Sequence, residues 1–260
     1  MRLPIYQIDA FADRVFAGNP AAVVPLEEWL PDATLQAIAA ENNLSETAFF
    51  IRQGETYALR WFTPTVEVDL CGHATLASAY VVFRFLAPEK RRIAFETRKS
   101  GTLVVWRQGD ELAMDFPTWI PEPCETPSGL AVALGRNPSE VLASRAYLAI
   151  YDRESDIAAI KPDFAALKRL GQAVIVSAPG SGGVDFVSRF FAPGLGIDED
   201  PVTGGAHCQL IPYWAKRLGK TRLSARQISS RGGALSCAIE GDRVTIAGQA
   251  QLYLEGRITL

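Results

Sequence analysis

The sequence predicts a mixed α and β fold that is repeated in two similar halves. Short apolar strands and apolar helices alternate along the 260 residues of the chain. In addition, the segment Arg60–Pro64 (RWFTP) is echoed by Arg189–Pro193 (RFFAP), and each copy is followed by a glycine turn that opens an apolar helix. The same order of elements is difficult to obtain twice by chance, so we interpret it as an internal duplication.

In the first half, alternating apolar residues predict a series of strands. They cover Ile5–Phe11, Glu46–Ile51, Tyr57–Phe62, Arg92–Thr97, Leu103–Arg107 and Glu111–Phe116. One helix is predicted over Pro31–Glu41, with Asp32 in its first turn. A second helix is predicted over Ala74–Leu86, and because it is apolar nearly all round, we expect it to be central and buried.

A proline-rich stretch, Pro117–Pro127, reads as a linker because proline cannot hold regular structure for long. The sequence therefore predicts one half over residues 1–117 and another over 118–260. The final strand, near Gln251–Leu260, could return to the first half.

The second half repeats the pattern. It is predicted to contain a helix over Asp163–Leu170, strands over Ala173–Ser177 and Val184–Phe191, and a helix over Ala206–Leu218 that stops at Gly219. Pro212 lies inside this last helix and predicts a kink or an early break, since proline removes a helix hydrogen bond.

The composition is that of an ordinary globular protein, with a formal net charge of -3. Lys and Arg are scattered, which argues against a nucleic-acid surface. No segment is long and apolar enough to span a bilayer, and the N-terminus lacks the pattern of a signal peptide. The four cysteines show no paired spacing, so reduced thiols in a cytoplasmic protein are expected.

The two glycine turns are the first candidate for a functional site. A duplicated fold should bring the two helix starts to face each other across a cleft, and helix N-termini attract anions. The only two histidines, His73 and His207, lie in these turns. A lone histidine is often structural, but the paired placement favours a site role for His73 and leaves His207 open.

Acidic residues complete the candidate set. Asp198, Glu199 and Asp200 stand before the second turn and exceed what helix capping needs. Glu46, in NNLSETAFF, begins a predicted strand, where a glutamate is usually a surface residue. The sequence has no metal-ligand spacing and no dinucleotide or P-loop fingerprint, so we expect neither a metal nor another cofactor.

At several separate motifs the chain resembles the PhzF family, the phenazine-biosynthesis-like isomerases, which are related in fold to diaminopimelate epimerase and proline racemase. In order, the motifs are IDAFADRVFAGNPAAVV, NNLSETAFF, LRWFTPTVEVDLCGHATLASA, RFFAPGLGIDEDPVTGGAH and SSRGGAL. The resemblance implies an α+β fold of two pseudo-symmetric domains, each a mostly antiparallel sheet wrapped around a central helix. It also implies a homodimer.

The resemblance also implies site residues. The family's catalytic carboxylate falls on Glu46, with His73 and Asp200 as supporting polar groups. Substrate-contacting positions fall on Asn19, Gly72, Ala74, Thr203, Gly204 and Gly205. Family members often carry serine at the position of Gly205, so a hydroxyl group is missing here. The phenazine precursor is therefore not the expected substrate.

These residues suggest a cofactor-free isomerase in which Glu46 takes a proton from a carbon of a small, anionic carboxylate or amino-acid-like substrate and returns it to another carbon. Two alternatives remain open. One is a racemase or epimerase that uses Cys71, which lies where thiol-using relatives carry a cysteine, together with Asp200. The other is a non-catalytic small-molecule binder with the same fold.

Overall fold

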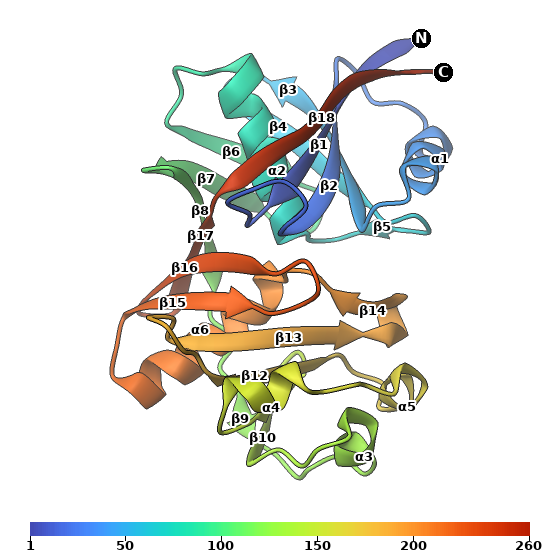
Figure 1. The fold of residues 1–260 in the computed structure, drawn as a ribbon. Helices are drawn as coiled ribbons and strands as arrows, with labels where there is room; N and C mark the ends of the chain where they lie inside the picture. Colours follow the sequence, from blue (N-terminus) through green and yellow to red (C-terminus); the bar gives the residue numbers. More distant parts are fainter. The chain divides into compact units, whose positions relative to one another are not determined.

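The computed structural model describes residues 1–260 and divides the chain into two compact units. Unit 1 comprises Met1–Asp115 together with Ala247–Leu260, and unit 2 comprises Phe116–Ile246. Both units are α+β, and they are similar to each other in their elements (Figure 1). None of the helices is both long and apolar enough to cross a membrane.

Unit 1 is built around one mixed sheet. Its strands are β1 (Arg2–Ala10), β2 (Asn19–Leu26), β3 (Glu46–Gln53), β4 (Thr56–Phe62), β5 (Glu67–Val68), β6 (Arg92–Thr97), β7 (Thr102–Gln108), β8 (Glu111–Pro117) and β18 (Ala250–Thr259). The C-terminal β18 pairs antiparallel with β1 along its whole length. The sheet then continues through β2, β3, β4, β6, β7 and β8, with parallel pairings only at β2–β3 and β4–β6.

Two helices cover this sheet. Helix α1 (Asp32–Asn42) buries Leu35 and Ile38 in an apolar cluster with β1, β2 and β3. Helix α2 (Gly72–Val81) packs against β1, β2 and β3 and continues into a π-helical turn, Val82–Leu86. Almost every residue of α2 is buried, which confirms the expectation of a central helix.

Unit 2 repeats the plan. Its strands are β9 (Glu122–Pro123), β10 (Glu140–Ala143), β11 (Tyr147–Ile150), β12 (Val174–Pro179), β13 (Phe186–Ala192), β14 (Ile197–Asp200), β15 (Arg222–Gln227) and β16 (Gly233–Glu240), followed by β17 (Arg243–Gly248). Its helices are α3 (Leu130–Leu134), α4 (Glu154–Ala158), α5 (Phe164–Arg169) and the central α6 (Gly204–Leu218), with a short 3-10 turn, Pro193–Leu195.

The repeated pentapeptide has a structural cause. Arg60 on β4 donates two hydrogen bonds, of 2.7 and 2.8 Å, to the carboxylate of Glu67 on β5. Arg189 on β13 donates two hydrogen bonds of the same lengths to the carboxylate of Glu199 on β14. Each guanidinium also lies over the aromatic ring two residues later, at 5.0 and 4.9 Å. The pairing order agrees as well, because β4–β6 and β13–β15 are both parallel and β3–β4 and β12–β13 are both antiparallel.

The expectation of an early break at Pro212 is wrong, because α6 runs unbroken to Leu218 and ends at Gly219 in the left-handed conformation. Proline at 212 cannot donate to the carbonyl of Cys208, four residues earlier. The backbone N–H of Trp119, in the linker, donates to that carbonyl at 2.9 Å instead. The linker thereby satisfies the acceptor that proline leaves open.

Candidate active site

The N-terminus of α2 brings together the groups of the first glycine turn. Cys71 is the N-cap residue, in an extended conformation, and Gly72, His73 and Ala74 form the first turn. The first N–H groups of a helix have no partner within the helix, so this turn presents donors and a positive dipole end. His73 is 5% exposed and Cys71 is 6% exposed.

Two strands bring further side chains to this helix start. β2 and β3 run parallel, with Ala21 opposite Glu46, so both strands begin at the same end of the sheet. Glu46 is the first residue of β3 and Asn19 the first residue of β2. Because the start of a strand next to a buried helix excludes water, Glu46 is only 8% exposed and Asn19 is fully buried.

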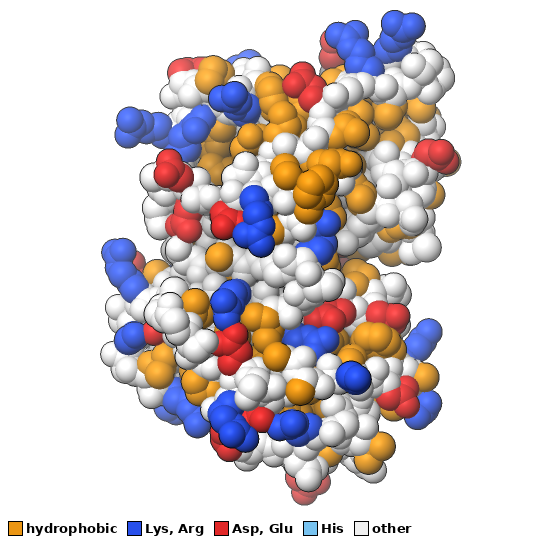
Figure 2. Space-filling model, in the orientation of Figure 1, with side chains coloured by type: hydrophobic (Ala, Val, Ile, Leu, Met, Phe, Trp, Pro, Cys, Tyr) orange, Lys and Arg blue, Asp and Glu red, His pale blue; other side chains and the backbone are white.

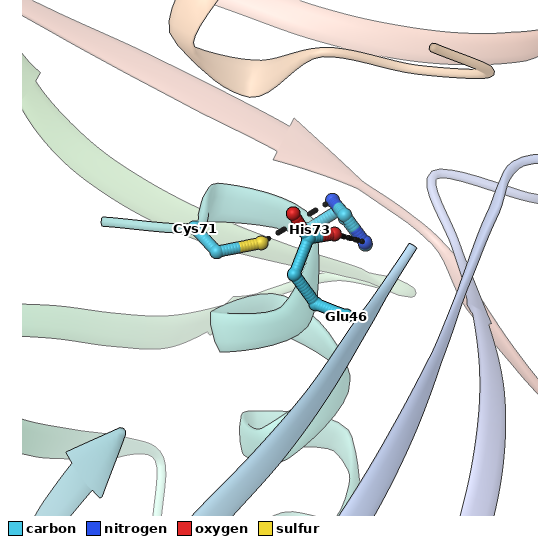
Figure 3. Close-up of side chains that lie close together, drawn as sticks. All are labelled: Glu46, Cys71 and His73. Atoms are coloured by element: carbon cyan, nitrogen blue, oxygen red, sulfur yellow. Dashed lines mark hydrogen bonds and ion pairs between the residues drawn. The ribbon is translucent and has the colours of Figure 1, made fainter. Parts of the chain in front are cut away.

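His73 is the centre of the cluster (Figure 3). Its Nε2 atom lies 3.1 Å from Oε2 of Glu46. On the other side of the ring, Nδ1 lies 3.2 Å from the amide nitrogen of Asn19 and 3.5 Å from Sγ of Cys71. The imidazole therefore stands between a carboxyl group and a thiol.

The charges in this cluster differ from those of the free side chains. Burial, reinforced by the nearby Glu46, raises the pKa of the Cys71 thiol to about 11, so the thiol is protonated at neutral pH. Burial alone would lower the pKa of His73. Cys71 when ionised and Glu46 act in the opposite direction, and the net direction of the His73 pKa is upward.

Unit 2 contains a second polar cluster at the N-terminus of α6. Thr203 is the N-cap residue, and its hydroxyl donates a short hydrogen bond to Oδ2 of Asp200, which is 8% exposed. The amide side chain of Gln227, on β15, accepts from the Thr203 N–H at 2.9 Å and donates to the Asp200 carbonyl at 2.8 Å. Asp200 and Thr203 are thus held in fixed positions.

The remaining predicted positions in unit 2 are helical. Gly204 and Gly205 form the first turn of α6. A Cβ atom on Gly205 would lie 3.5 Å from the ring of Trp119, which is ordinary van der Waals contact. His207 is fully buried, and its Nδ1–H donates to the Thr203 carbonyl at 2.8 Å. Burial lowers the pKa of His207 to about 4, so this histidine is neutral and structural.

Comparison with known proteins decides the family. The family model of the phenazine biosynthesis-like proteins (PhzC-PhzF) matches residues 8–256. This chain is a member of that family. An uncharacterized isomerase of Pseudomonas aeruginosa is 56% identical over 260 residues, and the human phenazine biosynthesis-like domain-containing protein is 38% identical over 288 residues, each alignment covering 100% of both chains. The chain is accordingly a PhzF-like isomerase.

Similarity to solved structures supports the same family and fold. A PhzF-family protein of Enterococcus faecalis superposes with a TM-score of 0.97 at 49% identity, covering 100% of both chains. A hydroxyproline epimerase of Agrobacterium vitis superposes with a TM-score of 0.61 at 11% identity, covering 99% of this chain and 92% of the other. The second likeness concerns the fold alone, and it matches the two similar domains expected from the sequence.

As a member of the family, the chain places its predicted residues in two groups. Glu46, His73 and Asn19 meet at the start of α2 with Gly72 and Ala74, and Asp200 and Thr203 meet at the start of α6 with Gly204 and Gly205. Sequence reasoning missed the contact of Cys71 with His73 and the role of Gln227. Nothing in the sequence around Gln227 indicates that it bridges Asp200 and Thr203, because the contact spans 24 residues or more.

One group of three His, Cys, Asp or Glu side chains lies close enough together to hold a metal ion, with its ligand atoms within 4.8 Å of one another. The group consists of Glu46, Cys71 and His73. Their arrangement fits a metal poorly, because the thiol and the carboxyl group contact opposite nitrogens of the same ring. One ion can bind only one of these nitrogens. We therefore interpret the cluster as acid–base groups.

Proposed function

We propose that this isomerase moves a proton between two carbons of a small carboxylate or amino-acid-like substrate, with Glu46 as general acid and base. The observation that carries the proposal is the Glu46–His73 pair, a buried carboxyl group 3.1 Å from an imidazole at a helix N-terminus. Family membership supports it, since relatives that match along the whole chain are named isomerases.

Glu46 has the right surroundings for the proton transfer. The residue is 8% exposed, and Oε2 lies 3.1 Å from Nε2 of His73, so the carboxyl group is held in a site that excludes water. Glu46 would remove a proton from a C–H bond beside a carbonyl or carboxyl group, and the electron pair of that bond would move onto the adjacent oxygen. Where a carbon–carbon double bond is conjugated with this anion, the electron pair returns through it and the double bond shifts by one position. The protonated Glu46 would then deliver the proton to the carbon at the far end of that double bond, so that substrate and product are isomers.

The developing negative charge needs nearby donors. His73 and the N–H groups of the first turn of α2 supply them in unit 1. The proposal gives Asp200, held by Thr203 and Gln227, the role of orienting an amine or hydroxyl group of the substrate. The residues proposed to contact the substrate are Asn19, Gly72, Ala74, Thr203, Gly204 and Gly205.

Proton exchange in deuterated water tests this proposal. Wild type and Glu46→Gln are incubated with a panel of small carboxylates and amino-acid-like compounds, and deuterium uptake at carbon is read by mass spectrometry. The proposal predicts uptake with wild type alone. Uptake that persists in Glu46→Gln would refute Glu46 as the base. A wild type that is stabilised by a panel compound in a thermal-shift screen, but exchanges no deuterium into it, would be a binder.

One contact favours a second candidate, an epimerase in which the Cys71 thiol exchanges a proton with the substrate and Asp200 is the second acid–base group. Sγ of Cys71 lies 3.5 Å from Nδ1 of His73, so the thiol stands directly beside a titratable ring. The thiol pKa of about 11 weakens this candidate, because a thiolate base is scarce at neutral pH. Cys71→Ser separates the two, since it should abolish an epimerase that depends on the thiol and spare an enzyme that depends on Glu46.

We further propose a cytoplasmic location. None of the four cysteines forms a disulfide, and three of them are buried, which suits a compartment that keeps thiols reduced.

A further inference from the structure

A tryptophan and an arginine lie beside the first turn of α6. The ring of Trp119, in the linker, is the group nearest to the side-chain position of Gly205. A Cβ atom at Gly205 would lie 3.5 and 3.7 Å from two carbons of its six-membered ring. The guanidinium of Arg145 lies over the Trp119 ring, 4.4 Å from the ring centroid. Arg145 is therefore one aromatic ring away from Gly205.

Hydrogen bonds to α6 hold both side chains beside this turn. The backbone N–H of Trp119 donates to the Cys208 carbonyl at 2.9 Å. Arg145 lies in the turn between β10 and β11, and the buried side chain of Gln209 binds the backbone of the residue that follows it. The amide nitrogen of Gln209 donates to the carbonyl there at 2.9 Å, and its oxygen accepts from the N–H at 3.4 Å. Cys208 and Gln209 lie three and four residues after Gly205, so all three share one face of the helix.

This surface is open to a small molecule. Arg145 is exposed, and Trp119, Thr203 and Gly205 are half-buried, whereas Gly204 is buried. A ligand that contacts Gly205 therefore meets the Trp119 ring next and the guanidinium beyond it.

Arg145 has no acidic partner within the protein. Lys and Arg side chains are spread over the face of the molecule in Figure 2, and Asp and Glu side chains lie among them. Arg145 nevertheless makes no ion pair and no side-chain hydrogen bond. Its charge is felt at the buried start of α6. Burial raises the pKa of the Cys208 thiol to about 12, and the positive charge of Arg145 acts against that rise.

A guanidinium in this position suits a carboxylate. Cation–π attraction holds the Arg145 guanidinium over the Trp119 ring. Its five N–H donors lie in the plane of the guanidinium, so stacking on a ring leaves them free to bind at the edge. A carboxylate accepts two such N–H groups side by side, which is the strongest pairing an arginine makes.

We propose that Arg145 binds a second carboxylate of the substrate, so that the substrate class is a small dicarboxylate. Trp119 is a positioning residue, because its ring holds the guanidinium at a fixed place beside Gly205. The inference rests on the proposed function in one respect, the placing of the substrate at Gly205. The carboxyl group beside the reacting carbon is the first of the two, and Arg145 takes no part in the proton transfer.

Matched ligand pairs test this specificity. Calorimetry measures the binding of succinate and succinamate, L-aspartate and L-asparagine, and L-glutamate and L-glutamine to the full-length protein. Each monoamide keeps the shape of its dicarboxylate and lacks one negative charge. Wild type should bind at least one dicarboxylate roughly tenfold or more tighter than its monoamide. Arg145→Gln should reduce this ratio to within about twofold and leave the affinity for the monoamide within about threefold of wild type. The control Arg222→Gln changes another exposed arginine, at the start of β15 and away from Gln227, and should keep the wild-type ratio.

Two substitutions of Trp119 test its positioning role. Trp119→Leu removes the ring and should lower the ratio to about the level of Arg145→Gln. Trp119→Phe keeps an aromatic face and should hold the ratio within about threefold of wild type. A ring with a purely structural role would affect a dicarboxylate and its monoamide equally, and the ratio would then survive Trp119→Leu.

A wild type that binds none of the dicarboxylates, or binds each no tighter than its monoamide, would overturn the inference. So would a ratio that survives Arg145→Gln. Deuterium exchange keeps this test apart from the proposed function. Exchange into a dicarboxylate that needs Glu46 but ignores Arg145 would refute the inference alone. A ratio that needs Arg145, with exchange that persists in Glu46→Gln, would refute the proposed function alone.

Discussion

Replacing the buried His207 with glutamine tests whether this histidine is structural. His207 is fully buried beside the Phe186 ring, and its Nδ1–H donates to the Thr203 carbonyl four residues earlier in the chain. A glutamine in the same helical position can donate to that carbonyl from its amide nitrogen. The variant His207→Gln therefore keeps the hydrogen bond and removes the titration.

The size of the expected loss in unfolding free energy follows from the pKa of His207. Burial lowers the pKa of His207 to about 4 in the folded protein, whereas an unfolded chain has about 6.5. Between these two pH values the unfolded state binds more protons than the folded state. The contribution of neutral His207 to the free energy of unfolding is therefore fully present above about pH 6.5 and is lost as the pH falls toward 4. The loss is about 2 kcal/mol at pH 5 and roughly 3 kcal/mol below pH 4.

Urea unfolding followed by tryptophan fluorescence measures this effect at pH 7 and pH 5. Other titrating groups are shared by wild type and variant, so the difference between the two pH slopes isolates His207. Wild type should lose about 2 kcal/mol more than His207→Gln between these values. Equal losses in the two proteins would refute a buried, neutral His207.

Three further predictions concern the two repeated arginines, the reactivity of the thiols and Gly205. Arg60→Lys and Arg189→Lys should each lower the free energy of unfolding by about 2 kcal/mol, because lysine cannot make both hydrogen bonds to the partner glutamate. Urea unfolding measures both losses, and sharply unequal losses would contradict the repeated role of the two arginines. Iodoacetamide at pH 7.5 should modify half-buried Cys124 well before buried Cys71, whose pKa is about 11. Peptide mass spectrometry measures the order of modification, and the reverse order would mean that Cys71 is accessible and ionised. Gly205→Ser should fold with a change in unfolding free energy within about 1 kcal/mol, since the added Cβ meets only ordinary contacts, and a larger loss in urea unfolding would show that the site is too tight.

The internal repeat could be predicted from the sequence because one interaction fixes it. Arg60 and Arg189 each need an aromatic ring two residues later and a glutamate on the next short strand, so the local spacing is constrained in both units. Helix α6 could likewise be placed, since Gly219 ends it in the left-handed conformation that glycine adopts most easily.

Other features depend on contacts that sequence patterns do not contain. β2 reads NPAAVVPL, and its two prolines argue against an inner strand, yet it lies between β1 and β3. The break expected at Pro212 fails because Trp119, 93 residues upstream of it, supplies the missing donor. Gln227 joins the second cluster in the same way, through a parallel strand that brings β15 beside β13.

The sequence allowed the residues of the candidate site to be named, but not their arrangement in space. Glu46, His73 and Asn19 could be named from the motifs, and the structure shows that the parallel β2–β3 pair and the start of α2 bring them together. The thiol of Cys71 completes the cluster because the N-cap residue is only two residues from His73 in the chain. Which atoms meet depends on the register of β2 against β3, and no local pattern fixes that register.

The most direct test of the central claim separates binding from proton transfer at Glu46. With a panel carboxylate that exchanges deuterium in wild type, calorimetry measures binding and mass spectrometry measures exchange in wild type, Glu46→Gln and the exposed control Glu41→Gln. We predict that Glu46→Gln keeps the dissociation constant within about threefold and loses exchange by about 10³-fold or more, whereas Glu41→Gln matches wild type in both. Exchange in Glu46→Gln within tenfold of wild type would contradict the account.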